Sequence, residues 1–154
     1  MLAQLELGKL YASNLGGGTD PHGDSAKWYR MAAEQGEPEA QYTMGSYSEQ
    51  GRGVAKDATQ ALLWYRAAAD QGHAGGLFGV GMLYAKGNGV AENPQLAYKY
   101  LRIAAARNEL NPGAAGAFWA KSASEELARK LSAAERAEAE ALVASWQPGA
   151  PLPR

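Results

Sequence analysis

Polar and apolar residues along most of the chain follow the spacing of amphipathic helices that are interrupted by glycine-rich turns. Over residues 38–50, apolar or small side chains recur at every third or fourth position, which predicts a helix. Two glycines follow within 51–54, and glycine adopts backbone angles that other residues resist, so the helix is expected to end there. Asp57 suits the N-cap of a second helix over about 58–71. One unit therefore consists of a helix, a glycine turn and a second helix.

This unit recurs along the chain with a fixed step. The stretch WYRMAAEQG starts at Trp28, returns as WYRAAADQG at Trp64, and returns again as YLRIAAARN at Tyr100, each 36 residues after the last. The Gly-x-Gly-Val turn at 51–54 recurs at 87–90 in the same register. Two separate blocks that keep one step predict a repeat protein, in which neighbouring helical hairpins bury a core that no single hairpin could bury.

The repeat register also sets the expected limits of each unit. Gly36 and Gly72 stand where the second helix of a unit should end, and Asn108 holds the matching position in the third unit. Ser132 and Glu135 form a capping-box pattern that opens one more helix. We predict one repeat domain over 1–146, with units at about 3–36, 38–72 and 74–108, a degenerate unit at 110–131, a capping helix at 133–146, and then a proline-rich tail at 147–154 that is a disordered end or a linker.

The last predicted helix has an apolar side that suits an end cap. A solenoid needs such a cap because its open terminal face would otherwise stay apolar. The expected packing side consists of Ala134, Ala137, Ala141, Leu142, Ser145 and Trp146. The carboxylates on the last helices lie among basic residues, and we interpret them as solvated: Glu125, Glu126, Glu138 and Glu140.

At these positions the chain resembles Sel1-like repeats, which are relatives of the tetratricopeptide repeat. The second unit matches the family pattern at Ala40, Met44, Gly45, Gly51, Gly53, Val54, Ala61, Trp64, Tyr65, Ala68, Gln71 and Gly72. The resemblance extends over roughly 3–108, although the loop of the first unit at 15–21 departs from the pattern. It implies an all-α fold, a right-handed α/α superhelical solenoid of helix-turn-helix repeats with a C-terminal capping helix.

Glycines inside the predicted helices indicate close helix packing. Gly45 and Gly81 each cost about 1 kcal/mol of helix propensity relative to alanine, which is tolerable where a neighbouring helix must approach closely. We expect Trp28, Trp64 and Tyr100 to fill the gaps between layers.

Composition and charge exclude several classes of protein. The chain has 154 residues, a net charge of -1 and no cysteine. A disulfide scaffold is therefore excluded, and no basic excess points to nucleic acid. The apolar runs are shorter than the roughly 18 residues of a membrane span, so membrane insertion is not expected. The first residues lack a signal-peptide pattern, which predicts a cytoplasmic protein as the sequence is written, or a periplasmic or secreted one if it is a trimmed fragment.

Candidate catalytic chemistry is sparse. His22 stands between Asp20 and Asp24, which resembles a set of metal ligands, but we interpret the segment as a solvated loop with turn-forming aspartates. His73 is expected to be an exposed residue of the turn between units. The glycines at 76–81 lack the strand and the Gly-Lys-Ser/Thr of a phosphate-binding loop. We predict no catalysis, cofactor or metal.

Arg30, Arg66 and Arg102 recur at one position of three successive second helices. Stacked units would hold them about 10 Å apart as a cationic ladder for an acidic partner. The favoured alternative is that Glu34 and Asp70, four residues later, pair with Arg30 and Arg66 on the helix surface. Arg102 has no carboxylate at that spacing.

Residues of the first helices that lie off the core stripe are the candidate partner contacts, because first helices usually line the concave side of a curved repeat stack. These residues are Leu5, Lys9, Tyr42, Ser46, Glu49, Phe78, Met82, Lys86, Phe118 and Lys121. Aromatic anchors flanked by charge suit a protein or peptide ligand. The alternative, that Tyr42 and Phe78 fold into the core as part of the repeat, stays open at this point.

We therefore predict a non-catalytic scaffold or adaptor that binds another protein or a peptide in its concave groove, in a bacterium as the alanine- and glycine-rich composition indicates. The resemblance implies roles in envelope assembly, signalling, host interaction or inhibition of an effector. The main alternative is a carbohydrate- or peptidoglycan-binding module, because aromatic side chains in a groove also suit sugars; an enzyme is less favoured. Leu2, Leu5 and Leu7 begin a unit that no cap precedes, which predicts either that the chain is a piece of a longer array or that this N-terminal edge self-associates.

Overall fold

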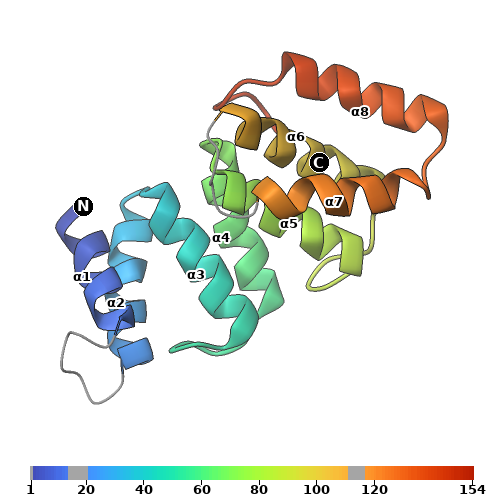
Figure 1. Ribbon diagram of the computed structural model, residues 1–154. Helices are drawn as coiled ribbons and strands as arrows, with labels where there is room; N and C mark the ends of the chain where they lie inside the picture. The colour runs from blue at the N-terminus through green and yellow to red at the C-terminus, as the bar shows by residue number, and fades with distance from the viewer. Residues whose placement is uncertain (1, 14–20, 111–116) are drawn as a thin grey trace.

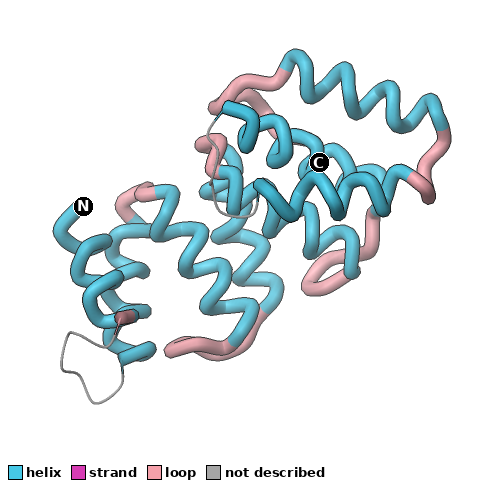
Figure 2. The backbone as a smooth tube through the Cα atoms, in the orientation of Figure 1, coloured by secondary structure: helices cyan, strands magenta, loops and turns pink. Residues whose placement is uncertain are grey.

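The computed structural model describes residues 2–13, 21–110 and 117–154, and these residues form eight helices and no strand (Figures 1 and 2). The helices follow one another along an elongated body, with α1 at one end and α8 at the other (Figure 1). This confirms the predicted all-α fold. In chain order the helices are α1 (Leu2–Ala12), α2 (Pro21–Glu34), α3 (Pro38–Gln50), α4 (Ala58–Asp70), α5 (Ala74–Lys86), α6 (Pro94–Leu110), α7 (Ala117–Ala128) and α8 (Ala133–Ser145).

Helices pack in sequence as antiparallel hairpins. α1 packs on α2, α3 on α4, and α5 on α6, while α2 with α3 and α4 with α5 join neighbouring hairpins. α7 and α8 both pack on α6. The result is a right-handed solenoid in which each unit contacts its neighbours in the chain.

The helix ends follow the local signals in most cases. Asp57 caps α4 by accepting hydrogen bonds from the backbone N–H groups of Thr59 and Gln60 (2.9 and 3.1 Å). Gly36 and Gly72 have φ of 89° and 80°, a left-handed conformation that favours glycine. The expected helix end at Asn108 is wrong, because α6 continues to Leu110 through residues that include neither glycine nor proline.

The mid-helix glycines accommodate side chains of the following helix. A Cβ atom at Gly45 would lie 2.4 Å from the ring of Tyr65, and one at Gly81 would lie 2.7 Å from Leu101. Tyr65 and Leu101, at one repeat position, therefore fill the notches that glycine leaves. Trp28, Trp64 and Tyr100, at the preceding repeat position, were expected to fill the gaps between layers. Of these three residues, only Tyr100 is fully buried.

Buried residues form two clusters. The smaller one joins α1, α2 and α3, and the larger one extends from α4 to the last residues of the chain. Trp64 of α4 packs against the smaller cluster and stays partly exposed, as Trp28 of α2 does. Tyr100, at the same repeat position of α6, is 1% exposed and belongs to the larger cluster.

α8 packs on α6 through both polar and apolar contacts, and its predicted packing side is correct only in part. Lys99 pairs with Glu138, and Tyr98 donates a hydrogen bond to Glu140 (3.0 Å). Both carboxylates thus bind α6. Glu138 stays exposed to solvent as expected, whereas Glu140 is partly buried. Ala139 of α8 and Trp146, just past the helix end, are buried, and Leu142 packs against the larger core cluster. The residues expected at this interface but exposed in the structure are Ala134, Ala137, Ala141 and Ser145.

Candidate interaction surfaces

The first helices form the inner side of the solenoid's curve. α3 packs against α5, and α5 against α7, whereas the described parts of the second helices show no comparable packing between α2, α4 and α6. Helices that crowd together lie inside a bend, so α3, α5 and α7 face inward. The predicted contact residues on these helices that have described side chains are partly or fully exposed, and we call them the inner wall: Tyr42, Ser46, Glu49, Phe78, Met82, Lys86 and Lys121.

Tyr42 connects α3 to the start of α5 through a row of rings. Its ring centroid lies 5.8 Å from that of Tyr65 and 5.1 Å from that of His73. Burial raises the pKa of the Tyr42 hydroxyl, and the nearby carboxylates of Glu39 and Glu49 add to this effect. The Tyr65 hydroxyl donates a hydrogen bond to Glu49 (2.9 Å). Tyr42 thus contacts the start of the next unit through His73, whereas Glu49 joins the two helices of its own unit.

His73 is a structural residue, and its expected role as an exposed turn residue is wrong. It is the N-cap of α5, where its Nδ1 accepts a hydrogen bond from the backbone N–H of Gly76 (3.2 Å). Its Nε2 lies 3.0 Å from a carboxylate oxygen of Glu39, and this hydrogen bond lowers the pKa of the Glu39 carboxyl. The sequence held a signal for this role, since Glu37 caps α3 at the equivalent position.

Phe78 and Met82 of α5 are partly buried. Both pack against the larger core cluster and keep part of their side chains at the surface. Lys86 and Lys121 are exposed, and the side chain of Phe118 lies outside the described residues. α5 therefore presents accessible apolar surface next to exposed lysines.

The predicted contacts on α1 differ from each other. Leu5 is 5% exposed and belongs to the smaller core cluster, so it does not contribute to an accessible surface. Lys9 is exposed and pairs with Glu6 (3.2 Å). On α3, Ser46 accepts a hydrogen bond from Gln50 (2.9 Å) and remains partly exposed.

The three repeated arginines have different surroundings. Nη2 of Arg66 donates a hydrogen bond to the hydroxyl of Tyr84 (3.0 Å), and the guanidinium lies 5.8 Å from the centroid of that ring. Arg102 donates two hydrogen bonds to Glu140 of α8 (2.7 and 3.0 Å) and thereby lowers the pKa of that carboxyl. Arg30 is exposed on α2.

The ion pairs expected within single helices are not observed. Across residues 22–107, where side chains are described, no ion pair joins Arg30 to Glu34 or Arg66 to Asp70. For Arg66 the reason is that the Tyr84 ring of the next helix offers both a hydrogen-bond acceptor and an aromatic face.

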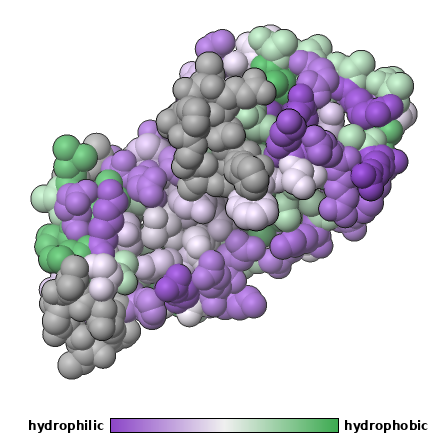
Figure 3. Space-filling model, in the orientation of Figure 1, coloured by the Kyte–Doolittle hydropathy of each residue, from purple (hydrophilic) through white to green (hydrophobic). Residues whose placement is uncertain are grey.

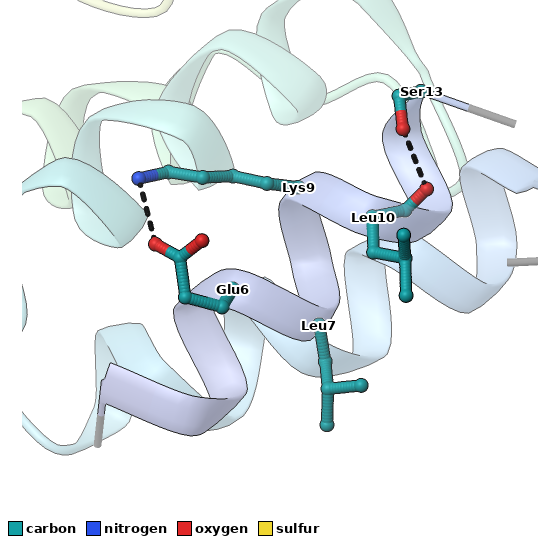
Figure 4. Close-up of a pocket in the computed structure, with 5 residues that line it drawn as sticks. All are labelled: Glu6, Leu7, Lys9, Leu10 and Ser13. Carbon is teal, nitrogen blue, oxygen red and sulfur yellow. Dashed lines mark hydrogen bonds and ion pairs between the residues drawn. The ribbon is translucent and has the colours of Figure 1, made fainter. Parts of the chain in front are cut away.

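Leu2, Leu7 and Leu10 form an apolar surface that we call the α1 face. Leu2 is 70% and Leu10 42% exposed. Leu7 and Leu10 point to the same side of α1 and line an open depression of about 520 Å³ (Figure 4). Apolar atoms also gather at this end of the molecule in Figure 3. The equivalent positions of α3 and α5 are buried in the core: Met44, Tyr47, Val80 and Leu83.

The tail at 147–154 is neither a disordered end nor a linker, because it folds back between α4 and α6. Leu152 is 9% exposed, the backbone N–H of Gly149 donates to the carbonyl oxygen of Asp70 (3.1 Å), and the Tyr100 hydroxyl donates to the carbonyl oxygen of Pro153 (3.0 Å). Prolines prevent a helix here but not extended docking. A cavity of about 410 Å³ remains beside the tail, and we call this site the α4–α6 groove, lined by Arg66, Asp70, Tyr100, Gly149, Ala150, Pro151, Leu152 and Arg154.

The candidate metal ligands His22 and Asp24 and the glycine-rich stretch at 76–81 lie within helices. His22 and Asp24 occupy the first turn of α2 instead of a loop, and Asp20 lies outside the described residues. No group of three or more metal-binding side chains occurs in the parts of the chain that the structure describes. Residues 76–81 lie inside α5. None of the described helices has both the length and the apolar character that crossing a bilayer requires.

Comparison with known proteins identifies the family. The model of the Sel1 repeat matches residues 2–37, 38–73 and 74–109, in register with the three hairpins from α1 to α6. The chain belongs to the Sel1 repeat family. Proteins with Sel1 repeats generally mediate protein–protein interactions and are typically non-catalytic scaffolds. A search of curated proteins found no match.

Two solved bacterial structures share the fold. One is c5321, described as a protective antigen of uropathogenic Escherichia coli strains that displays an SLR fold, with 32% identity and a TM-score of 0.78 over 92% of this chain and 28% of the antigen. The other is a Sel1 repeat protein from Oxalobacter formigenes, with 37% identity and a TM-score of 0.63 over 68% of this chain and 41% of that protein. The chain thus spans less than half the length of either structure.

Proposed function

We propose that this chain is a non-catalytic bacterial adaptor that binds a segment of another protein along its inner wall. The observation that carries the proposal is the pair Phe78 and Met82, which stay partly exposed on α5 although both also pack against the core. Apolar side chains that are already held in place by the core lose little conformational entropy on binding, which favours their use as anchors. Lys86 lies one helical turn beyond Met82 and adds a charge beside these anchors.

Charge along the inner wall supports a particular kind of ligand. Glu39 and Glu49 make the α3 side acidic, whereas Lys86 and Lys121 make the α5 and α7 side basic. A ligand with an apolar centre, basic residues toward α3 and acidic residues toward α7 would complement both charge and hydrophobicity. Such complementarity fixes the orientation of the ligand and speeds association more than it raises affinity.

Capture of a partner from bacterial lysate, followed by measurement of its affinity, tests this proposal. Replacing both Phe78 and Met82 by alanine should weaken binding by about tenfold or more, as expected for central apolar anchors. The matched control is Leu63→Ala on the second helix α4, whose side chain is 56% exposed away from the first helices. Equal affinity of the double variant and the control would contradict the inner wall as the binding surface. Retention on sedimented peptidoglycan without a protein partner would favour the carbohydrate-binding alternative.

The α1 face supports a second proposal, that two copies of the chain associate through it. Leu2 and Leu10 are exposed apolar side chains on one helix, and a two-fold axis would bury the leucines of both copies against each other. Sedimentation velocity should detect a dimer whose fraction rises with concentration, and Leu10→Glu should abolish it. Leu63→Glu adds the same charge at another exposed leucine and should leave the dimer intact. A monomer at all concentrations would refute this second proposal.

A further inference from the structure

The docked tail shows how the space between two second helices receives an extended segment. Three contacts hold the tail. The backbone N–H of Gly149 donates to the carbonyl oxygen of Asp70 at the end of α4, and the Tyr100 hydroxyl of α6 donates to the carbonyl oxygen of Pro153. The side chain of Leu152 is buried. Pro148 also packs over Gly72, where an added Cβ would lie 3.0 Å from the proline ring. The site thus recognises both backbone groups and apolar surface of a proline-containing segment.

The repeat provides the same positions one unit earlier. Moving back by the 36-residue step takes Arg66 to Arg30, Asp70 to Glu34 and Tyr100 to Trp64. We call the site formed by Arg30 and Glu34 of α2 and Trp64 of α4 the α2–α4 seam. The side chain of Trp64 packs against the smaller core cluster, to which α2 contributes Ala26, Tyr29, Ala32 and Ala33.

The polar groups that hold the tail have unpaired counterparts in the α2–α4 seam. The carbonyl oxygen of Glu34 receives no hydrogen bond from any described residue, and Pro38, four residues on, has no N–H to donate. The indole N–H of Trp64 likewise bonds to no described residue, and since no buried polar side-chain atom in the described residues lacks a partner, this N–H reaches solvent. A donor and an acceptor thus stand at the positions that Tyr100 and Asp70 occupy in the α4–α6 groove.

We infer that the α2–α4 seam binds an extended, proline-containing segment of a partner protein, with the chemistry of residues 147–154. Proline-rich segments are common ligands of aromatic surfaces because their preformed extended conformation lowers the entropy lost on binding. The tail of a second copy is not the occupant, since its Leu152 is buried in its own groove. Beside the seam, Ser48 takes the place that Tyr84 holds beside the groove. This site lies on second helices and is independent of the inner wall.

Titration of the ¹⁵N-labelled full chain with the synthetic peptide QPGAPLPR tests the inference. We expect saturable shifts of the Trp64 indole N–H signal and of amides near Glu34. Trp64→Phe keeps an aromatic ring but removes the N–H, and should weaken binding by about tenfold, the equivalent of one net hydrogen bond. Trp119→Phe, at a tryptophan that is 64% exposed on α7, is the matched control and should not change the affinity.

The inference would be overturned by the absence of a saturable shift in the unaltered chain, by equal affinity of Trp64→Phe and the control, or by shifts confined to the α4–α6 groove. A peptide with glycine in place of each proline should bind more weakly, and equal binding would also count against the site. Circular dichroism confirms that each variant folds. Phe78→Ala with Met82→Ala should leave peptide binding unchanged, so failure of this inference and failure of the inner-wall proposal can be told apart.

Discussion

Two parts of the molecule use one repeat motif in different surroundings. In the part from α1 to α3, Arg30 is exposed and Leu10 is 42% exposed. In the part from α5 to the tail, Arg102 binds Glu140, and Leu83, the equivalent of Leu10, is 1% exposed. The motif therefore determines which helix each residue joins, whereas the neighbouring element determines whether that residue is buried, paired or free for a partner.

Burial also differs between the two parts at the repeat position that Trp64 and Tyr100 share. Tyr100 is 1% exposed beneath the tail, whereas Trp64 is only partly buried. Tyr100→Ala should therefore lower the free energy of unfolding by about 3–5 kcal/mol, and Trp64→Ala by about 1–3 kcal/mol. Urea denaturation monitored by circular dichroism measures both. Equal losses would mean that the tail does not distinguish the two positions.

The glycine notches are the feature that both parts share, but they differ in tightness. A Cβ at Gly45 would lie 2.4 Å from the Tyr65 ring, whereas one at Gly8 would lie 3.0 Å from the Tyr29 ring. We expect Gly45→Ala to destabilise the protein by about 1–3 kcal/mol through overpacking. Gly8→Ala should be close to neutral, because a gain of about 1 kcal/mol in helix propensity offsets a milder clash. Thermal melting of both variants checks the order, and a more damaging Gly8→Ala would reverse it.

The ion pair that fixes α8 should give the smallest effect and a dependence on pH. The hydrogen bond from Arg102 holds the pKa of the Glu140 carboxyl below its ordinary value, so the folded state favours the ionised carboxylate. This contribution is present above the unfolded pKa and is lost as the pH falls through the lowered, folded-state pKa. Glu140→Gln should cost less than about 1 kcal/mol at neutral pH, because the pair is partly exposed.

The free energy of unfolding measured from neutral to acidic pH tests this contribution of Glu140. Glu140→Gln should lose less stability than the unaltered chain between neutral pH and the acid range. Glu125→Gln, at an exposed residue of α7, serves as control and should follow the unaltered chain. An unchanged acid slope for Glu140→Gln would mean that the contact with Arg102 does not stabilise α8.

Much of the architecture could be predicted from the repeat, because helix ends depend on local chemistry. Asp57, Gly36 and Gly72 act where the sequence placed them, since a cap needs only its own side chain and the next few backbone groups. The partners of Arg66 and Arg102 could not be predicted in this way. Tyr84 and Glu140 lie 18 and 38 residues further along the chain and come close only when the helices pack.

For the candidate surfaces too, sequence spacing selected residues, but helix packing decided their exposure. Sequence spacing selected Phe78 and Met82 as residues off the core stripe, and both are partly exposed. The same spacing selected Leu5, which is buried, because burial depends on how α1 sits against α2 and α3. For Tyr42 and Glu49, packing against Tyr65 decides how much of each side chain stays available to a partner.

Residue types recurring at a step of 36 positions were enough to define the repeating unit, its glycine notches and its family. The docking of the proline-rich tail in the α4–α6 groove and the contacts of Glu138 and Glu140 with α6 became evident only from the packed helices. The local conformation of the proline-rich tail and of the α8 glutamates is the same whether their side chains face solvent or contact another helix. The free energy that favours the contact comes from residues of helices far apart in the chain.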